Sequence, residues 1–193
     1  MTHPLSNTTL FFHWTIALFM ISLLALGLIM HENKIYSLYP LHKSLGILVL
    51  PLALCRIYWR IKEKWPQPAH QLSSTWTYLS KIAHALLLCL TLLMPISGIL
   101  MSLLSGRGLT LFSYPLVLSQ KDSQGSFISL SKYGASIAHQ LHFLLSDLLI
   151  IIVGAHIIAA ITHHFFLKDK VFIRMMPFYL NAHSSMKSNT SIK

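Results

Sequence analysis

Histidine is the residue type whose number and placement in this chain could support chemistry. The 193 residues include 12 histidines, and several lie inside long apolar segments. An ionisable side chain in such a segment is energetically unfavourable, so it usually faces the interior of a helix bundle and marks a functional site. His142 and His156 share one such segment, and His13 and His42 begin two others. Because neutral imidazole is a common metal ligand, these four positions are candidate ligands.

The spacing of His142 and His156 predicts that one helix presents two ligands at different depths. The fourteen residues between them rise by about 21 Å along an α-helix. Fourteen steps of 100° end roughly 40° short of four full turns, so both side chains project from nearly one face. If successive helices alternate in direction, His42 lies level with His142, and His13 lies level with His156. A single histidine at the end of a segment is more often an interfacial polar residue, but two depth-matched pairs favour ligation.

Two pairs of imidazoles predict two bis-histidine sites for haem b. Bis-histidine ligation fills both axial positions of the iron, which favours electron transfer over oxygen activation. Covalent haem attachment is not expected, because the sequence has no C-x-x-C-H motif. His139 lies about 60° around the helix from His142 and is the alternative ligand. His84 has no depth-matched partner and is predicted to be an interfacial or packing residue, whereas Gly46 and Gly154 would let a flat macrocycle approach the backbone.

The segments that must position these histidines are predicted to cross a membrane. Hydrophobic residues make up 54% of the chain and charged residues only 10%, a balance typical of membrane proteins. Cys55 and Cys89 are predicted to be small core residues, and Pro95 is tolerated as a kink. The predicted fold is an all-α four-helix transmembrane bundle over residues 1–178, followed by a disordered tail over residues 179–193. Each span has roughly the 20 residues that a bilayer requires, and the four spans are 10–30, about 41–59, 82–104 and about 137–167.

The distribution of basic residues predicts the orientation of the bundle. Ten of the 15 Lys and Arg residues lie between the second and third spans or in the tail, and five lie in the other two connections. The positive-inside rule therefore predicts that both termini are cytoplasmic. In a soluble protein the net charge of +10 would suggest nucleic acid binding, but basic residues beside apolar segments predict contact with membrane lipid and no nucleic acid partner. The 105–135 connection is predicted to be a loop on the outer interface.

The chain resembles the bacterial cytochrome b561 family, which consists of small di-haem membrane cytochromes. The similarity is strongest in the closing block GAHIIAAITHHFFLKDKVFIRMMP, residues 154–177, and it covers nearly the whole chain up to about Phe178. The resemblance implies a multi-pass protein of the bacterial inner membrane, and it assigns the haem ligands to the same four histidines. Further matching positions are His13 with Trp14, His42 with Gly46, Arg56 with Arg60, and the segment 95–98.

The resemblance also implies transmembrane electron transfer from an outer donor to membrane ubiquinone. Some members of the family look like superoxide oxidases, which are oxidoreductases that pass an electron from superoxide to ubiquinone. The outer connections carry five Lys and Arg residues against Glu32 and Asp122, and such a positive excess attracts a small anion such as superoxide. Contact of these basic residues with lipid headgroups is an equal alternative.

Four other polar residues are candidates for the quinone and haem sites. His163 lies seven residues beyond His156 and about 20° from its face, so it is predicted to hydrogen-bond or protonate the quinone. Arg56 and Arg60 share a helix face, and they either bind haem propionates or extend to the headgroups. Asp147 lies deep in the fourth span and is predicted to be hydrogen-bonded or protonated, with a proton path as an alternative role.

Two other functions fit the same sequence. The chain could be a non-catalytic cytochrome b that anchors a dehydrogenase or hydrogenase, a hypothesis that rests on analogy. It could also be a haem-free transporter that uses the histidines and Asp147 as a proton relay. A reduced-minus-oxidised spectrum without a b-type band would favour the transporter. Activity found only in a complex with a redox partner protein would favour the anchor.

Overall fold

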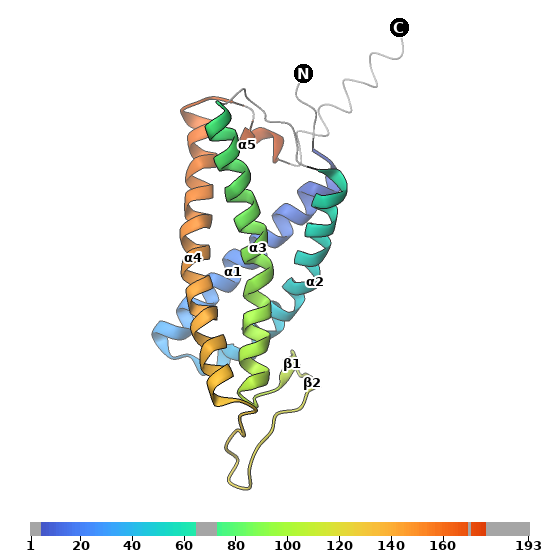
Figure 1. Cartoon of the computed structure of the whole chain (residues 1–193), viewed down its shortest axis with the longest axis vertical. Coiled ribbons are helices and arrows are strands. Elements are labelled where there is room, and N and C mark those ends of the chain that lie inside the picture. The colour runs from blue at the N-terminus through green and yellow to red at the C-terminus, as the bar shows by residue number, and fades with distance from the viewer. Residues whose placement is uncertain (1–4, 65–72, 170, 177–193) are drawn as a thin grey trace.

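Four long helices that alternate in direction form the structure (Figure 1). A computed structural model describes residues 5–64, 73–169 and 171–176. All four helices are long and apolar enough to cross a membrane, so the predicted four-helix bundle is confirmed. The predicted tail, residues 179–193, lies outside the described residues. The helices are α1 (Asn7–Asn33), α2 (Tyr39–Glu63), α3 (Ser74–Leu104) and α4 (Lys132–Phe165).

Local signals in the sequence set the limits of these helices. The Ser6 hydroxyl accepts a hydrogen bond from the Thr9 N–H at 3.1 Å, and the Ser131 hydroxyl accepts one from the Gly134 N–H at 3.0 Å. Both serines therefore satisfy amides of the first helical turn that have no partner within the helix. α1 ends at Lys34, which adopts the left-handed conformation with φ of 54° and stops the helix. The first three predicted spans lie inside α1, α2 and α3, and α3 continues through Pro95.

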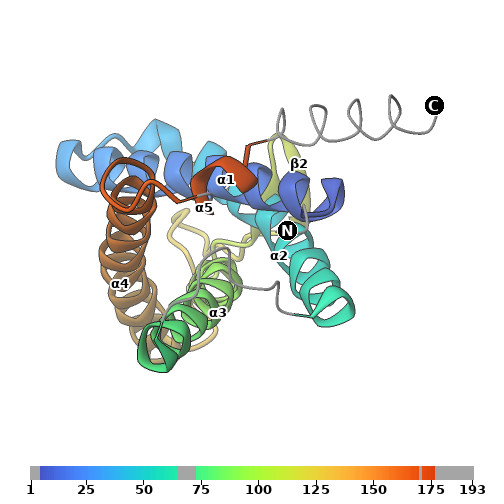
Figure 2. The same ribbon diagram turned by 90° about the horizontal axis from the view of Figure 1, so that it is seen from above.

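The helices pack against one another in chain order. α1 packs against α2, α2 against α3, and α3 against α4. Viewed from the end in Figure 2, α2 and α4 lie on either side of α3, and α1 crosses the opposite side. Within the described part of the chain, no comparable backbone contact joins α4 to α1 or α2. α4 therefore approaches α1 and α2 less closely than it approaches α3.

Most of the helical surface is apolar and exposed. Only 11–28% of the residues in the most apolar window of each helix are buried, and large side chains such as Leu18 and Ile151 face outward. A surface of this kind is stable in lipid but not in water. Cys55 and Cys89 are also exposed, so the prediction that they are core residues was wrong. When a helix is apolar on all sides, the spacing of its apolar residues does not show which face is buried.

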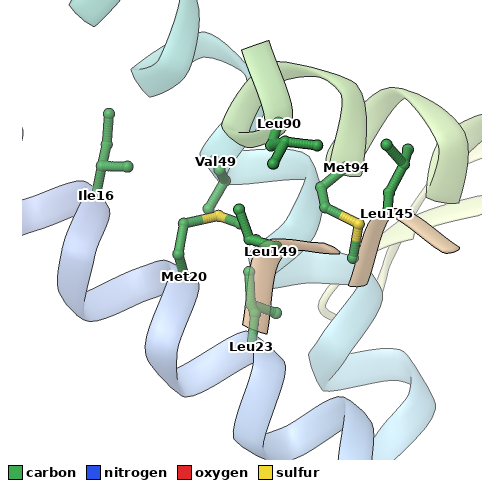
Figure 3. Packing of buried hydrophobic residues seen from close by; sticks show 8 residues of the cluster. All are labelled: Ile16, Met20, Leu23, Val49, Leu90, Met94, Leu145 and Leu149. Atoms are coloured by element: carbon green, nitrogen blue, oxygen red, sulfur yellow. The ribbon is translucent and has the colours of Figure 1, made fainter. Parts of the chain in front are cut away.

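The buried core is a single apolar layer to which all four helices contribute (Figure 3). In α4 this layer includes Leu145 and Leu149, which lie between His142 and His156 in the sequence. Met20 from α1 and Met94 from α3 also belong to it, and their flexible thioethers fill irregular space. The layer therefore occupies the middle of the bundle and separates the two depths at which the candidate histidines lie. Its remaining members are Ile16, Leu23, Val49 and Leu90.

The connection between α3 and α4 forms a short β-hairpin at one end of the bundle, where the sequence predicted a loop. β1 (Leu109–Leu111) pairs with β2 (Tyr114–Val117) in antiparallel fashion. The buried Ser44 hydroxyl on α2 accepts a hydrogen bond from the Phe112 N–H at 2.6 Å and donates to the Pro40 carbonyl at 2.7 Å, so it anchors the hairpin. The opposite end carries the short helix α5 (Val171–Arg174) (Figure 1). We call the two ends of the bundle the hairpin end and the α5 end.

Candidate functional site

Two pairs of histidines face each other at opposite ends of the bundle. At the hairpin end, the ring centroids of His42 on α2 and His142 on α4 are 6.4 Å apart. At the α5 end, the ring centroids of His13 on α1 and His156 on α4 are also 6.4 Å apart. Each pair thus spans the space where α4 lacks close backbone contact with α1 and α2. The structure brings the four histidines together in the two pairs that depth matching predicted.

The separation within each pair suits an iron atom held between two imidazoles. A ligating nitrogen lies about 2.0 Å from the metal and roughly 1.2 Å from the centre of its own ring, so opposed ligands place their ring centres roughly 6.4 Å apart. Both observed separations equal 6.4 Å. The centroids of rings that pack without a metal lie anywhere in a range of roughly 4.5–7 Å. The same separation in both pairs therefore favours the same kind of group between the two rings. The residues present therefore fit haem iron at both pairs.

The hydrogen bonds of His142 decide which of its nitrogens is available to a metal. The buried Ser97 hydroxyl donates to the Met94 carbonyl at 2.8 Å and lies 2.9 Å from Nδ1 of His142. Because its only proton goes to the carbonyl, the hydroxyl accepts from Nδ1–H, which leaves the Nε2 lone pair for a metal. His139 is exposed, and its ring lies 4.7 Å from Phe143. The geometry thus favours His142 over His139 as the ligand.

Replacing Ser97 with alanine should weaken haem binding at the hairpin end. Loss of the hydroxyl removes the acceptor that orients His142, and such supporting hydrogen bonds typically change metal affinity by about 10–100-fold. Haem titration of the haem-depleted protein, followed by visible spectroscopy, measures the effect. Ser97→Thr keeps the hydroxyl and serves as the matched control. Equal haem affinity in Ser97→Ala and the unmodified protein would show that Ser97 does not position the ligand.

Glycines adjoin both rings of the pair at the hairpin end. A Cβ added at Gly27 of α1 would lie 3.3 Å from Cε1 of His42, and one added at Gly98 of α3 would lie 3.1 Å from Cε1 of His142. These two glycines let neighbouring helices support the rings from behind. By contrast, a Cβ at Gly46 would meet nothing within 4 Å, and Gly46 lines a cavity between His42 and His142. Gly46 therefore adds no side chain to the small cavity between the two histidines, whose volume is about 40 Å³.

A Gly46→Ala substitution should lower haem occupancy at the hairpin end without disturbing the protein itself. The added methyl group contacts no protein atom within 4 Å, so it affects only a group that occupies this cavity. We expect an altered spectrum of one haem and no decrease in the thermal stability of the haem-depleted protein. Gly98→Ala provides the comparison, because its methyl group meets His142 directly. Full haem occupancy in Gly46→Ala would place the macrocycle elsewhere.

Two further side chains adjoin the pair at the α5 end. Arg56 donates a hydrogen bond from Nη2 to Nδ1 of His13 at 3.3 Å, so its guanidinium lies beside the histidine pair. The ring of His84 on α3 lies 5.4 Å from that of His156, and its Nδ1 donates to the Ser80 carbonyl at 2.6 Å. The sequence prediction paired histidines two by two, and it therefore did not place His84 near His156. The 5.4 Å separation is shorter than the roughly 6.4 Å that two opposed ligands of one metal ion need, so His84 fits the role of second ligand less well than His13.

His163 forms a short hydrogen bond near the end of α4. Its Nδ1 lies 2.5 Å from Oδ2 of Asp169, and the exposed fractions of the two side chains are 22% and 7%. The other carboxylate oxygen of Asp169 accepts from the Val171 N–H at 3.0 Å, so the same residue caps α5. A carboxylate at Nδ1 holds the Nδ1–H tautomer and leaves Nε2 to face a ligand. The sequence did not identify Asp169 as a partner of His163. It lies after the end of α4, and helical spacing predicts contacts only within a helix.

The remaining sequence candidates lie in different environments. Arg60 donates from Nη1 to the Lys64 carbonyl at 3.0 Å, and its charge also acts on His13. Asp147 is exposed on α4. The structure therefore places Asp147 outside both histidine pairs.

Cationic side chains gather on the hairpin end of the bundle. Arg107 and Lys121 both lie over the ring of Phe127, at 5.6 Å and 5.2 Å from its centroid. Lys43 follows directly after His42 and is half-buried. These positions confer positive charge on the surface next to one histidine pair, and such a field attracts small anions.

Comparisons with known proteins agree with this arrangement of histidines. The family model described as prokaryotic cytochrome b561 matches residues 5–178. The chain is 29% identical over 173 residues to cytochrome b561 homolog 2 of Escherichia coli (strain K12), covering 86% of this chain and 87% of the relative. It is also 29% identical over 137 residues to the probable superoxide oxidase CybB of Yersinia pestis, covering 71% and 73% of the two chains.

A third relative extends the similarity over almost a whole chain. Cytochrome b561 homolog 1 of Escherichia coli (strain K12) is 27% identical over 187 residues, covering 89% of this chain and 96% of the relative. The matched region includes all four long helices and both histidine pairs. The chain therefore belongs to the prokaryotic cytochrome b561 family of membrane haem proteins.

Proposed function

We propose that this protein transfers single electrons across the membrane, through two b-type haems, from an outer donor such as superoxide to ubiquinone. The observation that carries this proposal is the presence of two histidine pairs, each with ring centroids 6.4 Å apart. Bound haem would supply an iron that accepts and returns one electron at a time. The relative from Yersinia pestis that is described as a probable superoxide oxidase supports the choice of donor.

The protein's own residues would hold the two haems and keep them apart. We assign His42 and His142 as ligands at the hairpin end, and His13 and His156 as ligands at the α5 end. With two imidazoles at each iron, the haems would supply electron transfer and not oxygen binding. The apolar layer between the pairs, which includes Leu149, excludes water and ions from the middle of the bundle.

Arg56 is the residue that we assign to a haem propionate. Its guanidinium already lies at His13, and a guanidinium matches the geometry of a carboxylate. A haem held through Nε2 of His13 needs a proton on Nδ1, so Arg56 would release this nitrogen and become available to the propionate. Arg60 donates to the Lys64 carbonyl from Nη1, and the other N–H groups of its guanidinium could join Arg56 at the propionate.

The quinone end of the proposed route is His163 with Asp169. With Nδ1–H donated to the carboxylate at 2.5 Å, Nε2 of His163 is the nitrogen that would first take up a proton from water at the α5 end. The resulting imidazolium would then donate that proton to a quinone oxygen. Asp169 acts through His163 as a positioning residue, and its bond to Val171 N–H fixes the carboxylate itself. Trp14 ties the segment after α5 to α1 by donating to the Met175 carbonyl at 2.6 Å.

The outer donor would meet the hairpin end. Lys43, Arg107 and Lys121 provide positive charge there, which would raise the encounter rate of an anion and make that rate depend on ionic strength. We accordingly propose that the hairpin end faces outward and that the α5 end faces the cytoplasm. The bacterial inner membrane is the proposed location, with both termini on the cytoplasmic side.

Purified protein tests the proposal directly. We expect a reduced-minus-oxidised spectrum with a b-type band, two haems per chain, and superoxide-dependent reduction of a ubiquinone analogue that slows as salt is added. Heat-treated protein with the same haem content controls for free haem. A preparation without a b-type band would overturn the proposal. Normal haem content with quinone reduction only in the presence of a partner protein would instead identify a carrier subunit.

A further inference from the structure

We propose that the groove between α2 and α3 at the α5 end binds an anionic glycerophospholipid. This groove has a volume of about 440 Å³, and it lies away from the quinone candidates on α4 and α5. Ile57 and Ile61 of α2 form one wall, and Leu88 and Leu92 of α3 form the other. The inference does not depend on the proposed function, since none of these residues belongs to either histidine pair.

The walls of the groove suit an acyl chain. The lining residues of α3 extend from Ala85 to Leu92, which corresponds to about 10 Å along a helix. Every α3 side chain in the lining is apolar or a thiol, so a hydrocarbon chain leaves no polar group without a partner. Because the groove opens on the surface that faces lipid, a chain can enter it from the bilayer without crossing the protein.

The mouth of the groove suits an anionic headgroup. Arg60 and Lys64 both line it, and the Arg60 bond to the Lys64 carbonyl at 3.0 Å holds the two residues together. The nearby carboxylate, Glu63, does not line the groove; it hydrogen-bonds Thr9 of α1 at 2.5 Å and also attracts the charge of Arg60. Lys62 is also directed elsewhere, since its ammonium lies 5.1 Å from the centroid of Trp59. Arg60 and Lys64 outweigh the one nearby carboxylate, Glu63, so the net charge at the mouth is positive.

This combination favours a phospholipid over a quinone as the occupant. A quinone head is uncharged and gains little from two cations, whereas a phosphodiester gains from both. Basic clefts between transmembrane helices at the cytoplasmic side bind anionic lipid headgroups in this way. Phosphatidylglycerol provides the required phosphodiester and acyl chains, so it is a suitable probe.

Native mass spectrometry of the haem-loaded protein tests the inference. The protein is titrated with dioleoyl phosphatidylglycerol and, separately, with dioleoyl phosphatidylcholine. We expect stronger retention of phosphatidylglycerol, and Lys64→Gln should weaken that retention by about fivefold, the effect of one surface cation. Arg60→Gln should act similarly. Lys168→Gln, which removes an exposed cation near the end of α4, is the matched control and should leave retention unchanged.

Cys89 gives a second and local measurement. It lines the groove, and in a Cys55→Ala background it can carry a small fluorophore. Phosphatidylglycerol with brominated acyl chains should quench this label more strongly than the phosphatidylcholine equivalent, and Lys64→Gln should remove the difference. Equal retention and equal quenching by the two lipids would overturn the proposal. Displacement of phosphatidylglycerol by a ubiquinone analogue would also overturn it, by identifying the quinone as the occupant.

Discussion

Haem content is expected to fall from two per chain to about one when alanine replaces any single member of the histidine pairs, His13, His42, His142 or His156. Each substitution removes one of two axial ligands, and a haem held by the remaining imidazole is weakly bound and spectrally altered. Substitutions within one pair should change the same component of the reduced spectrum. The haem-to-protein ratio and the visible spectrum of each purified variant measure these effects.

His139 and His84 provide matched controls for these substitutions. His139 lies on the same helix as His142, with its ring 4.7 Å from Phe143, so His139→Ala should retain both haems. His84→Ala should also retain both, with a shifted potential at the α5 end because its ring lies 5.4 Å from that of His156. Loss of a haem in His139→Ala, together with normal haem content in His142→Ala, would contradict the ligand assignment.

Ubiquinone reduction is expected to fall by about 10²-fold or more in His163→Ala, the usual contribution of a general acid. Asp169→Asn should reduce the rate by about 10–100-fold, because the amide no longer provides the carboxylate that orients His163. Both variants should keep two haems that the outer donor reduces at the normal rate. Stopped-flow spectroscopy separates haem reduction from the later oxidation of the haems by quinone.

The asparagine substitution separates positioning from folding. Its side-chain oxygen can still accept the hydrogen bond from the Val171 N–H, so α5 should remain capped. His164→Ala is the control on the neighbouring position, since the His164 ring packs against Phe172 with centroids 5.0 Å apart and has no assigned role. Normal oxidation of the haems by quinone in His163→Ala would remove this residue from the proposed site. Equal loss of haem in all variants would point to a folding defect.

The four transmembrane helices could be predicted from the sequence because their signal is local. Each apolar segment exceeds the length that a bilayer requires, and helix formation satisfies the backbone hydrogen bonds that lipid cannot. The error on Cys55 and Cys89, both exposed, has the same origin. When all faces of a helix are apolar, hydropathy identifies the helix but not the side that packs.

The pairing of the histidines could be predicted because a helix has a fixed rise and rotation per residue. Given alternating helices, the positions of His42 and His142 along their spans determine that they lie at the same depth. Contacts of Ser97, His84 and Asp169 could not be predicted in this way. They depend on how α3 rotates against α4 and on how the chain folds back after Phe165, and both are set by packing between distant segments.

The sequence by itself determined that this is a four-helix membrane protein with imidazoles at two depths, because span length and helical periodicity are properties of continuous segments. Only the tertiary structure decided which nitrogen of His142 is available to a metal, which residue orients His163, and where a cationic groove opens between α2 and α3. These features are contacts between separate segments, and their geometry depends on the rotation and tilt of whole helices.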